Sequence, residues 1–183
     1  MRAIGILLLV GALNACTTTP VTTPREYLDE RTAATITVVK DPWIFTRAQD
    51  VAATIQHRDF LHLYAIDVNR MGDHRQYFAV LQAVPPEGVT GVRPTLELKS
   101  GEHSTVLEAT DVDPRELGIA QPIAEAYRLT AAWWYFPVDK QTLATIANTR
   151  ELHAAMIANE QRIPYVLWRD GREELSELTA VLP

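Results

Sequence analysis

Charged and imidazole side chains gather in one short stretch of the chain. Within residues 67–75 the polar members are Asp67, Asn69, Arg70, Asp73, His74 and Arg75. A guanidinium group binds a carboxylate or phosphate through two parallel hydrogen bonds. Arg70, His74 and Arg75 are therefore a candidate surface for an anionic ligand or partner. The alternative interpretation is a solvated turn with weak, exposed ion pairs.

Four aromatic residues follow one another at positions 133–136. In a strand, Trp133 and Tyr135 would face one side, and Trp134 and Phe136 would face the other. A strand that is covered on one face only would leave half of this run as an apolar patch of the kind that binds partners. Two interpretations stay open: a packed core, or a ligand or partner surface formed by Trp133 or Trp134.

The sequence lacks the motifs of the common catalytic and metal sites. None of Ser100, Ser104 and Ser176 lies in a G-x-S-x-G sequence, and the five histidines form no H-E-x-x-H motif. The eight scattered glycines form no phosphate-binding loop. We therefore expect no metal, no cofactor and no catalytic set. A hydrolase whose site is assembled from distant loops is the enzyme alternative.

Short apolar segments separated by turn residues predict a β-rich domain. The predicted strands span residues 35–39, 43–46, 60–68, 76–84, 95–99, 103–107, 128–136, 152–157 and 163–168. The turn at Met71, Gly72 and Asp73 makes 60–68 and 76–84 the clearest hairpin. This spacing predicts an antiparallel β-sandwich or open barrel with short helices, and an α+β layer is the alternative.

Three short helices are predicted between and after these strands. Asp113 and Pro114 have the cap and first-turn proline of a single helical turn. Asp139 can cap a second helix in which Leu143 and Ile146 face inward. The third is a closing helix, because its leucines recur at spacings of three and four, at Leu175, Leu178 and Leu182.

The first 15 residues have the pattern of an export signal. Arg2 precedes an apolar run at residues 3–12, which is too short for a spanning helix of about 20 residues. Leu13, Asn14, Ala15 and Cys16 follow. This tetrad resembles the lipobox of bacterial lipoproteins, with Leu at −3, Ala at −1 and Cys at +1. The resemblance implies that the signal is cut before Cys16 and that the Cys16 thiol carries a diacylglycerol. Ordinary secretion and an uncleaved anchor are the alternatives.

The residues after Cys16 form a tether rather than a core. Residues 17–24 hold only threonine, proline and one valine, and would reach about 25 Å in a polyproline II conformation. A single globular domain is expected at residues 25–183. Its segment 27–38 is similar to one in uncharacterised proteobacterial envelope lipoproteins. In enterobacterial lipoproteins, an Asp directly after the lipidated Cys favours retention in the inner membrane. This chain has Thr17 at that position, so the resemblance implies the periplasmic leaflet of the outer membrane.

Charge and cysteine usage exclude several classes of protein. The chain carries a net charge of −6, and no dense basic run suggests binding to nucleic acid. Cys16 is the only cysteine, so the domain after it has no disulfide, thiol nucleophile or thiolate zinc site. The leading prediction is a lipid-anchored, periplasm-facing structural or interaction module with an envelope protein partner. A small-ligand-binding lipoprotein and the hydrolase described above are the alternatives.

Overall fold

The computed structural model describes residues 23–54, 58–83, 92–126 and 131–183. The predicted signal, Cys16 and most of the predicted tether lie outside the described residues, as do His57, Val84 and Arg128. Within the described residues the chain is mainly antiparallel β with short helices and a C-terminal helix, so the predicted fold class is confirmed.

The elements of the described part are as follows. The strands are β1 (Arg25–Asp29), β2 (Ala34–Val38), β3 (Trp43–Arg47), β4 (Phe60–Arg70), β5 (Asp73–Gln82), β6 (Thr95–Ser100), β7 (His103–Glu108), β8 (Ala132–Val138), β9 (His153–Ala158) and β10 (Gln161–Arg169). The helices are α1 (Pro114–Leu117), α2 (Lys140–Ala147) and α3 (Arg172–Val181), with a 3₁₀ turn, η1, at Ala48–Asp50. All three predicted helices are confirmed, while β1 was not predicted.

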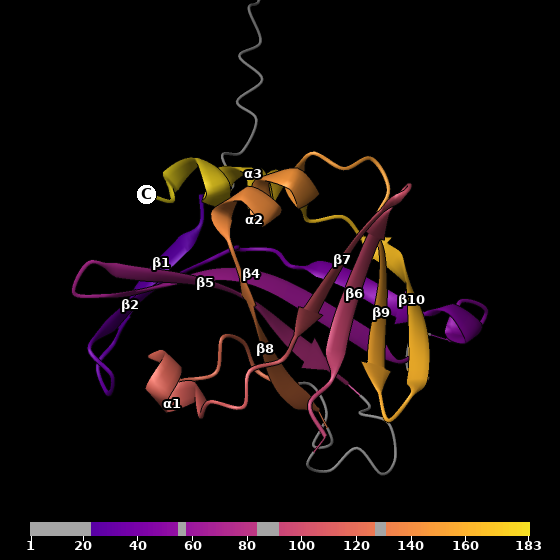
Figure 1. Cartoon of the computed structure of the whole chain (residues 1–183), viewed down its shortest axis with the longest axis horizontal. Coiled ribbons are helices and arrows are strands. Elements are labelled where there is room, and N and C mark those ends of the chain that lie inside the picture. The colour runs from indigo at the N-terminus through magenta and orange to yellow at the C-terminus, as the bar shows by residue number, and fades with distance from the viewer. Residues whose placement is uncertain (1–22, 55–57, 84–91, 127–130) are drawn as a thin grey trace, which may run out of the picture.

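The long strand β4 organises the sheet. One edge of β4 pairs with β5 along its whole length, and the other edge pairs with β3 at its start and with β2 at its end. From β3 the sheet continues through β10, β9, β6 and β7, and from β5 it continues to β8. The sheet curls until β7 approaches β8, and the backbone amide of Thr110 donates to the Tyr135 carbonyl at 2.8 Å. The result is an open barrel (Figure 1).

Alternating side chains of the strands fill the barrel. Phe78 of β5 lies opposite Phe136 of β8 in the register, and both are fully buried. Phe45 of β3 joins the same core. Helices α2 and α3 cover one end of the barrel (Figure 1), where Leu143 and Leu178 are fully buried. Among the described residues, no helix combines the length and apolar character needed to cross a membrane.

One side of the sheet extends beyond the barrel. Strand β2 pairs with β4 near the turn of the β4–β5 hairpin, β1 pairs with β2, and α1 packs beneath them (Figure 1). We call this part the arm: β1, β2, residues 66–77 and residues 113–123. The Arg25 guanidinium donates to the Ile123 carbonyl at 2.8 Å, so the first strand and the segment after α1 are directly joined. The arm holds most of the charged residues that the sequence singled out.

Candidate functional site

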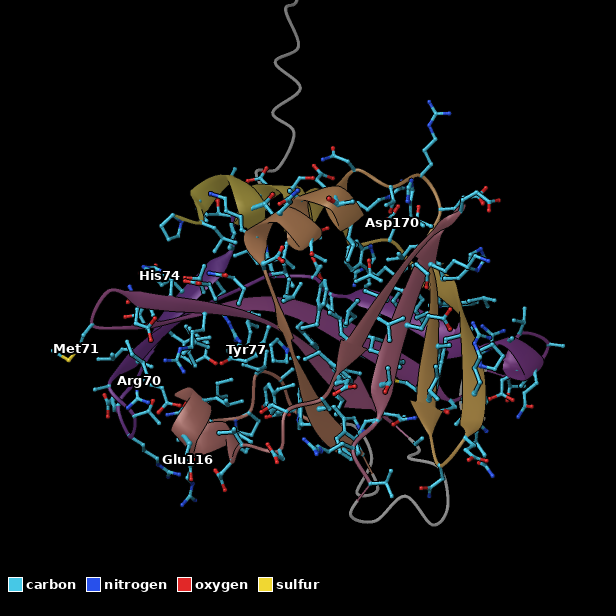
Figure 2. All side chains as sticks on the ribbon, viewed as in Figure 1. Arg70, Met71, His74, Tyr77, Glu116 and Asp170 are labelled. Atoms are coloured by element: carbon cyan, nitrogen blue, oxygen red, sulfur yellow. The ribbon has the colours of Figure 1, made fainter. Side chains whose placement is uncertain are left out.

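The β4–β5 hairpin separates the charged residues that the sequence grouped. Arg70 and Asp73 are partners in the register, as are Val68 and Arg75, so these four side chains share the face toward α1. His74 projects from the opposite face, and Figure 2 shows it across the hairpin ribbon from Arg70. Arg70 and Arg75, the two arginines expected to bind an anion, therefore share one face, whereas His74 lies on the other. Alternation along β5 sends neighbouring side chains to opposite faces.

The His74 face holds a carboxylate–imidazole pair. The buried carboxylate of Asp67 lies 2.7 Å from Nδ1 of His74 and accepts a 2.7 Å hydrogen bond from Nε2 of Gln76. A carboxylate at this position orients an imidazole as in a hydrolase. The serines lie elsewhere: Ser100 and Ser104 on β6 and β7, and Ser176 in α3. The geometry of the pair joins β4 to β5 through Asp67, His74 and Gln76, and no serine takes part in these hydrogen bonds.

On the α1 side of the arm, three segments enclose a cleft of about 430 Å³. It is lined by Arg31 of the β1–β2 turn, Arg70 at the end of β4, Arg115 of α1, Thr32 and Ala120. We call it the arginine cleft. Three of the five lining residues are arginines and none is acidic. Such a site attracts anions although the chain as a whole is acidic.

A buried aspartate positions two walls of the arginine cleft. The Asp29 carboxylate is fully buried and accepts backbone hydrogen bonds from Ala120 at 2.6 Å, Gln121 at 3.0 Å and Arg31 at 3.1 Å. Burial raises the pKa of this carboxyl, but backbone hydrogen bonds, chiefly from Ala120 and Gln121, hold the pKa below its ordinary value. An ionised Asp29 thus ties the β1–β2 turn to the segment after α1.

Close packing also fixes the position of the segment that follows α1. The Thr32 hydroxyl donates to the Gly118 carbonyl at 2.7 Å. Gly118 adopts a left-handed conformation with φ of 100°, and a Cβ there would lie 2.8 Å from Cγ1 of Val68. Only glycine meets both conditions without strain. The backbone beside Arg115 is therefore held tightly against β2 and β4.

The two predicted arginines differ in their partners. The Arg70 Nη1 donates to the backbone carbonyl of Glu116 at 3.1 Å, and none of the ion pairs among the described residues involves Arg70. Arg75 forms an ion pair with Asp73, with 2.8 Å between Nη2 and Oδ2. Arg70 and Arg75 together line a further cavity of about 140 Å³, with Asp73 and Glu116 also in its lining, but of the two only Arg70 also lines the arginine cleft. Arg70 therefore belongs to the arginine cleft, and the charge of Arg75 is already matched.

Sequence reasoning missed Arg31 and Arg115, which complete the arginine cleft. They lie far from Arg70 in the chain, and neither belongs to a motif. The one local signal was the Asp113–Pro114 cap, whose carboxylate accepts from the Arg115 amide at 2.8 Å. This signal predicted the turn that carries Arg115, but not the strands against which the turn packs.

The aromatic run alternates as predicted. Trp133 stacks on Tyr135, with centroids 6.3 Å apart, and it also contacts Tyr64 at 5.8 Å. Trp134 is on the opposite face, paired with Val80, and its indole nitrogen is buried without a hydrogen-bond partner in the described residues. Both tryptophans are half-buried and pack against the core. They line a cleft of about 300 Å³ along β8, so core and ligand interpretations each retain support.

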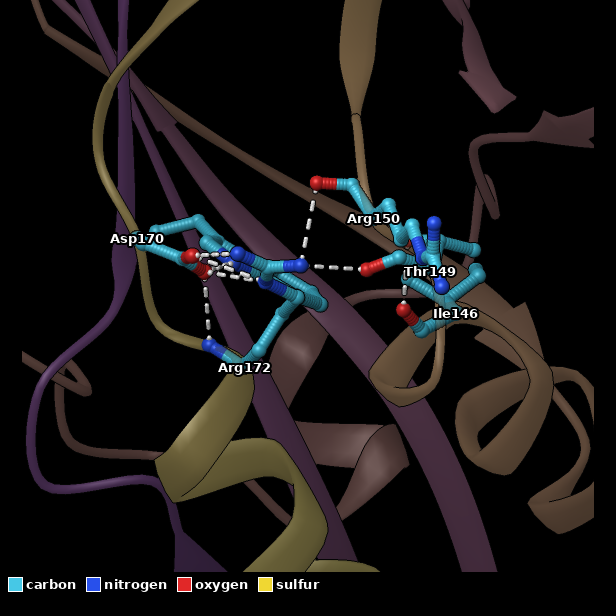
Figure 3. Close-up of polar contacts among 6 residues, drawn as sticks. Ile146, Thr149, Arg150, Asp170 and Arg172 are labelled. Carbon is cyan, nitrogen blue, oxygen red and sulfur yellow. Dashed lines mark hydrogen bonds and ion pairs between the residues drawn. The ribbon is translucent and has the colours of Figure 1, made fainter. Parts of the chain in front are cut away.

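A further charged cluster is structural. Arg172 pairs with Asp170 and donates to the backbone carbonyls of Thr149 and Arg150 (Figure 3). The same aspartate accepts from Nε1 of Trp43 at 3.1 Å. Hydrogen bonds from Arg172 hold the pKa of Asp170 below its ordinary value. These contacts join β3, the loop after α2 and the start of α3, and they leave Arg172 fully engaged.

Within the described residues, no group of three histidine, cysteine or acidic side chains is placed to hold a metal. Comparisons with known proteins assign no function to this chain. No family model, no curated protein and no solved structure matches the chain.

Proposed function

We propose that this chain is a lipid-anchored, periplasm-facing interaction module of the bacterial cell envelope, and that the arginine cleft is its binding surface. Cys16 carries the lipid, the Thr/Pro segment is the tether, and the outer membrane is the anchoring membrane. The partner is an envelope protein or ligand that presents negative charge to the cleft.

The observation that carries this proposal is the absence of counter-ions in the cleft. Among the described residues, none of the ion pairs involves Arg31, Arg70 or Arg115. Acidic residues outnumber basic ones by 23 to 17, so unmatched arginines are unexpected on this chain. Gathering three of them in one cleft costs free energy through mutual repulsion, which an anionic partner would relieve.

The path of the chain supports an outward-facing cleft. The tether joins the domain at Arg25, where β1 begins, and Arg31 follows the far end of that strand. At a rise of about 3.3 Å per residue, β1 carries the chain roughly 13 Å from the point of attachment before the turn that holds Arg31. A cleft displaced in this way is open to partners in the periplasm while the chain remains anchored.

Fatty-acid labelling tests the anchor. Cells that express the wild-type chain or Cys16→Ser are grown with a clickable palmitate analogue, and the purified proteins are compared. We expect label on the wild type and none on the variant, because Cys16 is the only thiol. Equal labelling of both would contradict the lipoprotein proposal.

Site-specific crosslinking tests the binding surface. The photoreactive residue p-benzoylphenylalanine replaces Met71, which is fully exposed beside Arg70, and in a control it replaces Val181, which is exposed on α3. We expect adducts from position 71 that disappear when Arg31, Arg70 and Arg115 are all changed to Gln. Adducts that persist without the arginines, or that form equally from position 181, would contradict the cleft as the binding surface.

A small-ligand binder that uses the β8 cleft is the second candidate. The supporting observation is the buried indole nitrogen of Trp134, a lining residue of this cleft, which has no hydrogen-bond partner among the described residues. An aromatic ligand with a hydrogen-bond acceptor would satisfy this nitrogen. Ligand-induced quenching of tryptophan fluorescence that is lost in Trp134→Phe would favour this candidate, whereas quenching retained in that variant would oppose it.

A further inference from the structure

The three arginines that line the arginine cleft come from three separate chain segments. Arg31 comes from a turn, Arg70 from a strand end and Arg115 from a helix. The acids nearest to Arg31 and Arg115 in sequence are Glu30, Asp113 and Glu116, and none of these lines the cleft. Arg70 is flanked by Asp67 and Asp73, whose carboxylates pair with His74 and Arg75 and do not line the cleft either. The Asp113 carboxylate is occupied by the Arg115 backbone amide. The cations of the lining are therefore not neutralised from within it.

The backbone beneath these cations is already in place. Asp29 ties residues 120 and 121 to the β1–β2 turn, and Thr32 ties the same turn to Gly118. Arg70 is itself held by the Glu116 carbonyl. A ligand that enters the cleft would therefore order side chains but not main-chain segments. Preorganisation of this kind reduces the entropic cost of binding.

The geometry points to a phosphate monoester of a small organic molecule as the ligand of the arginine cleft. Each guanidinium presents a planar fork that fits an anionic oxygen pair. A phosphate monoester carries close to two negative charges at neutral pH and three terminal oxygens, so it can engage three arginines, whereas one carboxylate offers two oxygens and one charge. The volume of about 430 Å³ exceeds that of the phosphate and leaves room for the esterified group.

This inference rests on the proposed function in taking the cleft as the binding surface, but it makes no use of the anchor. The phosphate could belong to a soluble metabolite or to a lipid headgroup. Both sources present the same chemistry to the arginines, and they are separated by the form in which the probe is offered.

Calorimetric titration of the full chain in detergent at low salt tests the soluble source, with phenyl phosphate as the probe and phthalate as the dicarboxylate comparator. We expect phenyl phosphate to bind, and to bind at least tenfold more weakly to each of Arg31→Gln, Arg70→Gln and Arg115→Gln. Arg150→Gln is the matched control, because Arg150 is also exposed but lies beyond α2, away from the arm. The variants should keep the wild-type unfolding midpoint, which separates lost contacts from lost structure.

Vesicles of phosphatidylcholine with phosphatidic acid test the lipid source. Binding that needs the three arginines and is displaced by phenyl phosphate would support a lipid phosphate, and binding of phenyl phosphate alone would support a soluble one. The inference is overturned if neither probe binds, if Arg150→Gln weakens binding as much as the cleft variants, or if phthalate binds as tightly as phenyl phosphate. Arginine-dependent crosslinks from position 71 without phosphate binding would reject the ligand class and leave the interaction module standing.

Discussion

The carboxylate of Asp29 accepts a 2.6 Å hydrogen bond from the backbone amide of Ala120, a residue 91 positions further along the chain. This contact joins the first strand of the fold to the segment that follows α1. It is buried and charge-assisted, and hydrogen bonds of that kind are about twice as strong as neutral ones. The arginine cleft therefore depends on a residue that does not line it.

Replacing this carboxylate should destabilise the arm. Asp29→Asn removes the charge and turns an amide NH₂ toward backbone donors, so at least one buried donor loses its acceptor. We expect a loss of about 1 to 3 kcal/mol in the free energy of unfolding, measured with urea. Glu30→Gln is the matched control, because Glu30 is the exposed neighbour, and it should change stability by less than about 0.5 kcal/mol. Equal effects of the two variants would show that the Asp29 contacts contribute nothing.

The same carboxylate sets a dependence on acid. Its folded-state pKa lies below the ordinary value of 3.8, so the folded state binds fewer protons than the unfolded state near that pH. The stability that it contributes is present above about pH 4 and is lost as the pH falls further. Asp29→Asn should show a shallower loss of stability than the wild type below this pH. Parallel curves for the two proteins would contradict the lowered pKa.

The closing helix offers a test of core packing. Leu178 of α3 is fully buried, whereas Val181 of the same helix is 61% exposed. Leu178→Ala should lower the free energy of unfolding by about 2 to 5 kcal/mol, because it leaves a cavity in a packed core. Val181→Ala should cost less than about 0.5 kcal/mol. A loss at Leu178 as small as that at Val181 would mean that α3 contributes little to the core.

The sequence predicted the regular elements well where apolar patterning was strong. The β4–β5 hairpin, the β6–β7 and β9–β10 pairs and the three capped or amphipathic helices occur close to their expected positions. Strand β1 was missed because its residues Arg25–Asp29 hold no β-branched side chain and are mostly exposed. It is an edge strand that owes its conformation to pairing with β2 rather than to its own propensity.

The candidate site was predictable only in part. Local charge density singled out Arg70, but alternation along β5 carried His74 to the other face. Arg31 and Arg115 reach the cleft through pairings of β1, β2 and β4 and through the Asp29 contacts, none of which has a local signature. These segments are far apart in the sequence and are brought together by the strand pairings. Composition and residue spacing do not reveal which strands pair.

The two tryptophans should differ in their contribution to stability. Trp134 faces the barrel interior opposite Val80, so Trp134→Ala should cost about 3 to 5 kcal/mol. Trp133 lies on the outer face against Tyr64 and Tyr135, and its truncation should cost less, about 1 to 2 kcal/mol. Urea unfolding of both variants measures the difference. Two losses below about 0.5 kcal/mol would show that both rings are surface residues, and two equally large losses would place both in the core.

The pH dependence near neutrality should come from His62. Burial lowers the pKa of this imidazole from 6.5 to about 4. Between these values the unfolded state binds a proton that the folded state does not, so stability falls as the pH drops from about 6.5 to about 4. The full shift corresponds to about 3 kcal/mol, since a tenfold change in proton affinity is worth about 1.4 kcal/mol. His62→Phe keeps a ring next to Phe60 and Tyr64 but cannot titrate, so its stability should fall less over this range.

The control for this prediction is His153→Gln, because His153 is an exposed histidine of β9. Urea unfolding is measured at pH 7, 6 and 5 for the three proteins. We expect the wild type and His153→Gln to lose stability in parallel and His62→Phe to diverge from them, since the imidazole that resists protonation in the fold is the one packed on β4. If all three curves run in parallel, a group other than these two histidines is responsible for the pH dependence. If His153→Gln diverges while His62→Phe does not, His153 rather than His62 is the histidine whose pKa is lowered in the folded state.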